Sequence, residues 1–260
     1  MKVVLFCGGQ GMRLRDYSEE VPKPMVPVGD RPILWHIMKY YAHFGHTEFI
    51  LCLGHGARSI KQFFLEYEEA VSNDFVLRRG GEEKELLARD IDDWTITFVD
   101  TGLYSEIGER LRRVRQYVDG EEMFLANYAD GVTNLDLTDY VKTFAQKERT
   151  AAFLAVRPPQ SYHVAEVDSG EVLGMGPIAK QDLWLNGGYF VFRPEIFDYI
   201  EPGEDLLAQP FQRMIARRTV YAHQFEDFWS PMDTFKERTY LDDLYSRGPA
   251  PWAVWKNDIA

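Results

Sequence analysis

Residues 3–29 read VVLFCGGQGMRLRDYSEEVPKPMVPVG. Residues 3–7 form an apolar run that ends at two glycines, a pattern typical of a buried strand that opens into a glycine-rich loop. Arg13 follows in that loop, and Lys23 stands between two prolines ten residues later. Glycines let backbone N–H groups approach a polyanion closely, and the two cations can neutralise it. The stretch therefore predicts a nucleoside triphosphate site at the end of a first strand.

Two common phosphate-binding motifs do not match this loop. The P-loop needs a Lys-Ser or Lys-Thr pair, and the dinucleotide fingerprint needs a further glycine, but Gly11 is followed by Met12, Arg13 and Leu14. For the loop alone, an ordinary glycine turn with a solvated Arg13 stays an alternative. The two prolines fix the backbone beside Lys23, which favours a required position for its ammonium group.

Strand-like and helix-like segments alternate along the chain, which favours an α/β fold with a mostly parallel sheet. We expect strands at residues 3–7, 49–53, 95–99, 123–126, 151–156, 188–192 and 220–223, a hairpin at 164–167 and 172–175, and helices at 33–44, 60–67, 108–118, 137–147, 206–217, 233–245 and after Pro194. Residues 73–93 are polar and poorly periodic. We interpret them as an irregular excursion that contacts a neighbouring subunit or covers the base.

Composition narrows the class of protein. The 260 residues are 45% hydrophobic and carry a net charge of −12, which argues against a nucleic-acid binder or an anionic-membrane binder. Cys7 and Cys52 lie in apolar runs, so we expect reduced core thiols. No apolar run approaches the length of a membrane span, and the first residues lack a signal-peptide pattern. We therefore expect a cytoplasmic enzyme.

Two aspartates are candidate metal ligands. Asp130 follows the predicted strand 123–126, so it lies at the carboxyl end of that strand, where open α/β sheets bind ligands. Asp233 stands at the start of a predicted helix. From the residues alone, Asp130 is equally well explained as a turn residue, and Asp233 is better explained as a helix N-cap.

The motifs together resemble a known family. The pattern Gly8-Gly9-x-Gly11-x-Arg13, followed by Pro-Lys23-Pro-Met, resembles the signature of the sugar-1-phosphate nucleotidylyltransferases, and within them the glucose-1-phosphate cytidylyltransferases are the most similar group. Further matching segments lie in the expected order at residues 32–39, 98–102, 108–111, 128–132, 186–190, 228–234 and 250–252. Because the segments span nearly the whole chain, they are more specific together than any one alone.

The resemblance implies a Rossmann-like mixed, mostly parallel sheet flanked by helices, with a small sugar-binding β region. It implies one nucleotidyltransferase domain over residues 1–260, with a nucleotide-binding half at 1–135 and a sugar-phosphate-binding half and tail at 136–260. It also implies a homo-oligomer, and we interpret the aromatic-rich tail, with Trp252 and Trp255, as a subunit contact.

The resemblance assigns roles residue by residue. Nucleotide-binding residues would be Gly8, Gly9, Gly11, Met12, Arg13, Gly108 and Arg110; catalytic residues Arg13 and Lys23; sugar-phosphate-binding residues Lys180, Asn186 and Gly187; and Mg²⁺ ligands Asp130 and Asp233. Arg13 would bind the leaving β- and γ-phosphates, and Lys23 the α-phosphate and the attacking phosphate. Arg110 has a solvated helix face as its alternative, and the Asn186-Gly187 pair has a simple turn.

Two departures from the family pattern concern substrate choice. Met12 stands where relatives commonly have Thr or Ser, and residues 173–182 lack the Glu-Lys-Pro motif that grips the sugar phosphate, although Lys180 offers a nearby cation. The expected function is Mg²⁺-dependent transfer of a cytidylyl group from CTP to glucose 1-phosphate or a related phosphorylated acceptor, which releases pyrophosphate. The alternatives are a uridylyl- or thymidylyltransferase and an inactive nucleotide-binding relative.

Overall fold

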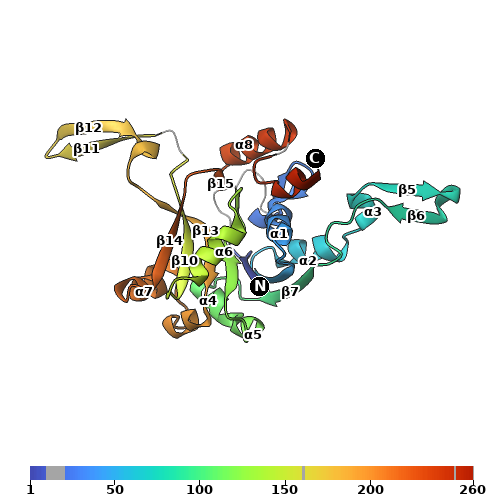
Figure 1. Ribbon diagram of the computed structural model, residues 1–260, viewed down its shortest axis with the longest axis horizontal. Helices are drawn as coiled ribbons and strands as arrows, with labels where there is room; N and C mark the ends of the chain where they lie inside the picture. Colours follow the sequence, from blue (N-terminus) through green and yellow to red (C-terminus); the bar gives the residue numbers. More distant parts are fainter. Residues whose placement is uncertain (10–20, 160–161, 249, 260) are drawn as a thin grey trace.

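The computed structural model describes residues 1–9, 21–159, 162–248 and 250–259. Its centre is a seven-stranded sheet in the order β14-β10-β13-β8-β1-β4-β7 (Figure 1). The strands are β1 (Val3–Phe6), β4 (Glu48–Leu53), β7 (Thr95–Asp100), β8 (Phe124–Asn127), β10 (Ala151–Val156), β13 (Leu185–Phe192) and β14 (Val220–Phe225). Strand β13 runs antiparallel to both its neighbours, and the other adjacent pairs are parallel. The predicted mixed, mostly parallel sheet is confirmed.

Helices cover both faces of the sheet. Val3 and Leu5 of β1 point into one buried apolar cluster, and Val4 and Phe6 point into a second cluster on the other face. The first cluster is covered by α1 (Ile33–His43), α2 (Ala57–Leu65), α6 (Leu137–Ala145) and α8 (Phe235–Ser246); the second is covered by α4 (Ile107–Arg113), α5 (Arg115–Val118), η5 (Pro194–Tyr199), η6 (Leu207–Phe211) and α7 (Gln212–Ala216). A strand buried on both faces reads as a continuous apolar run, which explains why β1 was visible in the sequence.

Three of the predicted helices have a different form in the structure. The helix expected at 108–118 is interrupted at Val114, between α4 and α5. The segment expected as one helix at 206–217 begins with the π-helical turn η6, which contains Pro210, and continues as α7. Proline has no backbone N–H and crowds the preceding turn, so a regular α-helix is disfavoured there. The helix expected after Pro194 is the 3₁₀-helix η5.

Two hairpins project from opposite ends of the molecule (Figure 1). The first is the predicted hairpin, β11 (His163–Asp168) with β12 (Glu171–Pro177). The second, β5 (Phe75–Arg78) with β6 (Glu83–Leu86), lies where we expected irregular chain, so that prediction is wrong. Its strands have four residues each and are mostly exposed. Strand β5 reads Phe-Val-Leu-Arg and β6 reads Glu-Lys-Glu-Leu, so neither shows the alternation of apolar and polar residues that marks a half-buried strand.

Short elements complete the fold. They are the pairs β2 (Pro27–Val28) with β3 (Arg31–Pro32) and β9 (Gly131–Thr133) with β15 (Trp229–Pro231), the helix α3 (Glu69–Ser72), and the short helices η2 (Lys23–Met25), η3 (Arg79–Gly81), η4 (Ile178–Lys180) and η7 (Val254–Ile259). No helix within the described ranges is both long and apolar enough to cross a membrane. Cys7 and Cys52 are buried and free, as predicted.

The aromatic tail packs against α1 of its own chain. Trp252 is 1% exposed, and its indole N–H donates to Nδ1 of His36 at 3.3 Å. The interpretation of Trp252 as a subunit contact is therefore wrong, because the side chain is part of this chain's core. The homo-oligomer itself stays a prediction.

Candidate active site

A short strand pair brings the two candidate metal ligands together. Strand β8 ends at Asn127, and β9 pairs antiparallel with β15 so that Gly131 lies opposite Pro231. One residue beyond that pair, the backbone N–H of Met232 donates to the carbonyl of Asp130 at 2.8 Å. This places Asp130 next to the residue that precedes Asp233. The chain between Asn127 and β9 passes through Ala129, which has a left-handed φ of 60°.

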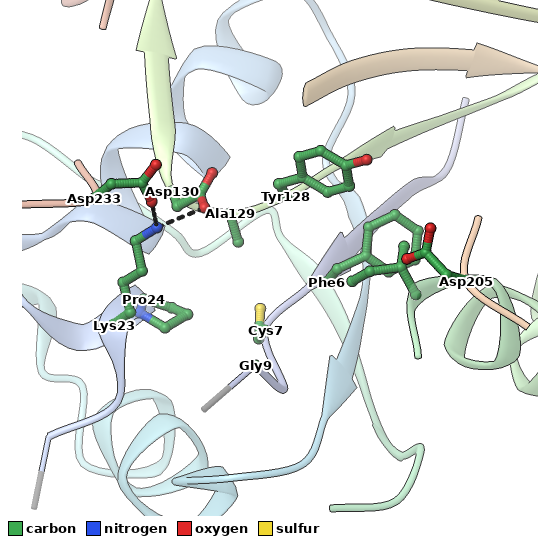
Figure 2. A pocket seen from close by; sticks show the side chains of 11 residues that line it. Phe6, Cys7, Gly9, Lys23, Pro24, Tyr128, Ala129, Asp130, Asp205 and Asp233 are labelled. Carbon is green, nitrogen blue, oxygen red and sulfur yellow. Dashed lines mark hydrogen bonds and ion pairs between the residues drawn. The ribbon is translucent and has the colours of Figure 1, made fainter. Parts of the chain in front are cut away.

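The side chain of Asn127 stabilises that turn. Its Oδ1 accepts from the buried backbone N–H of Ala129 at 2.7 Å. A left-handed non-glycine residue costs on the order of 1–3 kcal/mol and persists only where the surroundings hold it. The turn aims the Asp130 carboxylate away from the sheet and toward Lys23 (Figure 2).

Lys23 lies between the two carboxylates. Its Nζ donates to Asp130 Oδ2 at 2.7 Å and also to Asp233 Oδ1 (Figure 2). Burial alone would lower the pKa of Lys23, but the two carboxylates outweigh it and the pKa is raised. Burial raises the pKa of Asp130, with Asp233 and Glu237 adding to the rise and Lys23 opposing it. The site thus holds an ammonium group ionised against two converging carboxylates.

The interpretation of Asp233 as a helix N-cap is wrong. Thr234 caps α8: its hydroxyl accepts from the backbone N–H of Glu237, whose carboxylate accepts from the backbone N–H of Thr234. This is a capping box, and its Thr-x-x-Glu spacing is present in the sequence. Because Thr234 does the capping, the carboxylate of Asp233 is available to face Lys23.

A cavity of about 440 Å³ opens beside this cluster. It is lined by Phe6, Cys7, Gly9, Lys23, Pro24, Ile107, Tyr128, Ala129, Asp130, Asp205 and Asp233. Lys23, Asp130 and Asp233 form a charged end, while Phe6 and Tyr128 lie away from them on the other side (Figure 2). The cavity can therefore hold a ligand with phosphates at one end and a less polar ring at the other.

The start of the glycine loop is held from behind by Arg110. Arg110 is only 2% exposed, and its guanidinium group donates to the carbonyls of Gly8 at 2.9 Å and Gly102 at 2.9 Å. It also donates to the Leu53 carbonyl at 3.1 Å and the Thr101 hydroxyl at 2.8 Å. The alternative of a solvated helix face is therefore wrong.

The predicted nucleotide-binding glycines differ in their surroundings. A Cβ on Gly8 would lie 2.2 Å from Arg110 Nη1, so Gly8 leaves room for that side chain. Gly9 is exposed and lines the cavity, and no atom of the described residues would lie within 4 Å of a Cβ added there. Gly11, Met12 and Arg13 lie outside the described residues, so their predicted roles stay predictions.

The donor set at the charged end fits a hard divalent ion. Mg²⁺ is usually bound through one or two carboxylates together with waters and substrate phosphates. Asp130 and Asp233 provide two carboxylates that converge on one cation, Lys23 Nζ. Within the described part of the chain, no three His, Cys, Asp or Glu side chains gather as a metal site. The pair therefore suits an ion that is completed by substrate oxygens.

Comparison with known proteins identifies the family. Residues 2–242 match the family model described as nucleotidyl transferase. The glucose-1-phosphate cytidylyltransferase of Salmonella typhi is 35% identical over 258 residues, which cover 98% of this chain and 100% of that protein. The chain belongs to the nucleotidyl transferase family.

Two more distant similarities agree with this assignment. The UTP–glucose-1-phosphate uridylyltransferase of Synechocystis sp. is 26% identical, over 79% of this chain and 52% of that protein. The solved structure of a UDP-glucose pyrophosphorylase complexed with UDP-glucose matches with a TM-score of 0.68, over 95% of this chain and 98% of that chain, at 15% identity. The second likeness shows the shared fold alone.

In this nucleotidyltransferase, the three predicted sugar-phosphate residues lie outside the set of described residues that line the cavity. Asn186 is in β13, so the turn alternative is wrong; its Nδ2 donates to the Tyr128 hydroxyl at 3.2 Å. The carbonyl of Gly187 accepts from the Trp229 indole at 2.9 Å. Lys180 is exposed on η4, at the base of the β11–β12 hairpin. Among the described residues, the link between Asn186 and the cavity is its hydrogen bond to Tyr128.

Of the described residues that line the cavity, seven were not predicted as site residues: Phe6, Cys7, Pro24, Ile107, Tyr128, Ala129 and Asp205. Two of these seven, Tyr128 and Asp205, carry an oxygen that can form hydrogen bonds. Tyr128 stood in a matching segment without an assigned role, and Asp205 gave no functional signal. The sequence around Asp205 is that of a helix start, and its Oδ1 does accept from the backbone N–H groups of Leu207 and Ala208. Only the packing of residues 203–206 against Gly108 of α4 shows that Asp205 also lines the cavity.

Proposed function

We propose that this nucleotidyltransferase transfers a cytidylyl group from CTP to glucose 1-phosphate or a related phosphorylated acceptor, with Mg²⁺ as cofactor. The observation that carries the proposal is the convergence of Lys23, Asp130 and Asp233 at one end of a cavity that Gly9 also lines. Near full-length identity of 35% to a cytidylyltransferase, against 26% over part of a uridylyltransferase, favours CTP as donor.

The proposed chemistry needs charge stabilisation more than proton transfer. A phosphate oxygen of the acceptor attacks the α-phosphorus, the bond from that phosphorus to the β-phosphate bridging oxygen breaks, and pyrophosphate leaves. The attacking oxygen is already ionised at neutral pH, so no general base is required. Catalysis then consists of holding two anions in line and neutralising the developing charge. Lys23 would supply one such cation.

Asp130 and Asp233 would hold the Mg²⁺ ion. When bound, the ion would neutralise phosphate charge and act as a Lewis acid toward a phosphoryl oxygen. The two carboxylates also bind Lys23, so they orient its ammonium toward the same region of the cavity. Pro24, which is buried directly after Lys23, restricts the backbone that carries this side chain.

Pyrophosphate release tests the proposal. The purified protein is assayed with CTP, UTP or dTTP, Mg²⁺, and a panel of sugar 1-phosphates. We expect the highest rate with CTP and glucose 1-phosphate or a close analogue. Pyrophosphate release with UTP or dTTP in preference to CTP would contradict the donor assignment. No release from any pair, together with tight CTP binding, would identify an inactive nucleotide-binding relative instead.

The metal assignment is tested separately. Asp130→Asn and Asp233→Asn should each lower turnover on the order of 100-fold, because a neutral amide binds Mg²⁺ poorly. Asp136→Asn is the matched control, since Asp136 is an exposed aspartate that caps α6. If either active-site variant keeps a near wild-type rate at limiting Mg²⁺, that ligand assignment is wrong.

A further inference from the structure

The cavity contains one carboxylate that the proposed chemistry does not use. Asp205 lines it together with Phe6, Ile107 and Tyr128, and Figure 2 shows its carboxylate beside Phe6, on the far side from Lys23. The charge of Asp205 acts on Tyr128, adding to the effect of burial in raising the pKa of Tyr128. Asp205 therefore belongs to the apolar end of the cavity.

The position of Asp205 depends on close packing against α4. A Cβ on Gly108 would lie 2.6 Å from the carbonyl oxygen of Glu204 and 3.3 Å from the carbonyl carbon of Asp205. The backbone N–H of Glu109 donates to the Glu204 carbonyl at 3.0 Å, and the Glu109 carboxylate accepts from the backbone N–H of Gly203 at 3.1 Å. The loop that carries Asp205 is thus fixed against the start of α4.

The carboxylate is fixed at one oxygen only. Oδ1 of Asp205 accepts from the backbone N–H of Leu207 at 3.0 Å and of Ala208 at 2.9 Å. The backbone N–H of Asp205 donates to Gln209 Oε1 at 3.1 Å. Within the described ranges, Oδ2 has no hydrogen-bond or ion-pair partner. A half-buried oxygen acceptor is therefore held in place without a protein donor.

We propose that Asp205 is a substrate-binding residue that accepts a hydrogen bond from a hydroxyl or amino group of the substrate at the apolar end of the cavity. This rests on the proposed function and adds a recognition residue to it. An ionised carboxylate can only accept hydrogen bonds, so it selects ligand donors and rejects ligand acceptors. Phe6 and Ile107 line the cavity beside it and leave it half-buried, and hydrogen bonds gain strength where the surroundings are less polar than water. The donor group belongs either to the nucleoside or to the sugar of the acceptor.

The simpler explanation is that Asp205 only caps the helix that follows. Asp205→Asn separates the two explanations, because the amide keeps one oxygen for the Leu207 and Ala208 N–H groups and replaces Oδ2 by a donor. Asp136→Asn is the matched control: Asp136 caps α6 by accepting from the backbone N–H of Asp139 at 3.0 Å, and it is exposed outside the cavity.

The experiment measures kcat and KM for each substrate, the calorimetric Kd for CTP, and the melting temperature. For Asp205→Asn we expect KM or Kd of one ligand to rise by about tenfold or more, with kcat and the melting temperature much less affected. Asp136→Asn should leave all of them within about twofold, as expected of a surface cap.

The choice of substrates identifies the donor group. If the donor is the cytosine amino group, Asp205→Asn binds CTP more weakly and UTP more tightly than wild type does, because the new amide N–H₂ can donate to the uracil carbonyl. If it is a ribose hydroxyl, CTP and UTP weaken equally, and the corresponding deoxynucleotide no longer distinguishes variant from wild type. If it is a sugar hydroxyl, only the KM for the sugar 1-phosphate rises.

The proposal is overturned if Asp205→Asn matches wild type within about twofold for every ligand. If that variant fails to fold, Asp205→Ser repeats the test, because a serine hydroxyl can also cap the helix while Oδ2 is lost. A wild-type protein that releases no pyrophosphate refutes the proposed function, but its Kd for CTP still tests the nucleoside arm. A wild-type protein that binds neither CTP nor a sugar 1-phosphate overturns both proposals.

Discussion

The buried guanidinium of Arg110 should contribute strongly to stability in the absence of any ligand. No carboxylate lies within ion-pair distance of it among the described residues, and burial lowers its pKa. Its charge is instead stabilised by the carbonyls of Gly8, Leu53 and Gly102 and by the Thr101 hydroxyl. Arg110→Met keeps an unbranched apolar stem and removes every one of these donors.

The size of the stability loss in Arg110→Met depends on which of the carbonyl groups are left without a good hydrogen-bond donor. The Leu53 carbonyl keeps the backbone N–H of Thr101 at 2.9 Å and its hydroxyl at 2.8 Å. Among the described residues, the Gly8 carbonyl keeps only a long contact of 3.4 Å from the N–H of His55. A buried acceptor without a hydrogen bond lowers the free energy of unfolding by about 1–3 kcal/mol. Removal of the buried Arg110 charge offsets part of this loss, because the charge no longer has to be desolvated. We expect a net loss of about 3–4 kcal/mol, which lowers the melting temperature of a chain of this size by on the order of 10 °C.

Urea unfolding of the ligand-free protein measures this loss. Arg247→Met is the control, because Arg247 is an exposed arginine whose ion pair with the exposed Asp243 should contribute less than about 1 kcal/mol. Arg110→Lys should fall between wild type and Arg110→Met, since one ammonium cannot reproduce the planar fork. The reasoning is refuted if Arg110→Met unfolds within about 1 kcal/mol of wild type.

Three further predictions concern single side chains. Burial lowers the pKa of His36 in the folded protein to about 4, whereas the pKa of an unfolded histidine is about 6.5. The folded state is therefore favoured at pH values above about 6.5, where the ring is neutral, and this contribution to stability is lost as the pH falls toward 4. In urea titrations, the free energy of unfolding of His36→Gln should therefore fall by about 3 kcal/mol less than that of wild type between pH 7 and pH 4. Free energies of unfolding that fall in parallel for the two proteins would contradict this. Gly188→Ala should lower the melting temperature, because its φ is +76° and a Cβ would lie 2.8 Å from Tyr128; an unchanged melting temperature would contradict both the backbone strain and the steric contact. Lys23→Ala should reduce pyrophosphate release on the order of 100-fold with little change in melting temperature, whereas equal losses of both would assign it a structural role.

Much of the fold could be predicted because buried strands and helices have recognisable patterns of apolar residues. Strand β1 packs against helices on both faces and reads as an apolar run. Helix α1 shows helical periodicity because its polar residues Lys39 and His43 share one less buried side, while most of the helix is buried. The placement of Asp130 at the end of β8 followed from the strand alone. The β5–β6 hairpin could not be found in this way, because most of its residues are exposed, the apolar run of β5 is three residues long, and β6 is mainly charged.

The site was only partly predictable, because its contacts join distant segments. Asp233 meets Lys23 and Asp130 through the β9–β15 pair, whose three-residue strands are too short to show a period. The sequence did contain one overlooked signal, the spacing of Thr234 and Glu237, which assigns the helix cap to Thr234. Asp205 had no such signal, because its role as a cap accounts for its residue type completely.

Gly8 and Gly108 were both predicted as nucleotide-binding residues, but the structure gives each of them a different reason to be a glycine. The glycine loop suggested that the backbone at Gly8 approaches a phosphate, and the family resemblance placed Gly108 near the nucleotide. A Cβ on Gly8, however, would strike Arg110, and a Cβ on Gly108 would strike the carbonyl of Glu204. Arg110 follows Gly108 on α4, and it binds the Gly8 carbonyl. One turn of helix therefore fixes both the start of the glycine loop and the loop that carries Asp205. A side chain added at Gly108 would disturb the two ends of the cavity together, so Gly108→Ala should raise the KM of both substrates, whereas an effect on the nucleotide alone would show that the loop at Asp205 is held independently of α4.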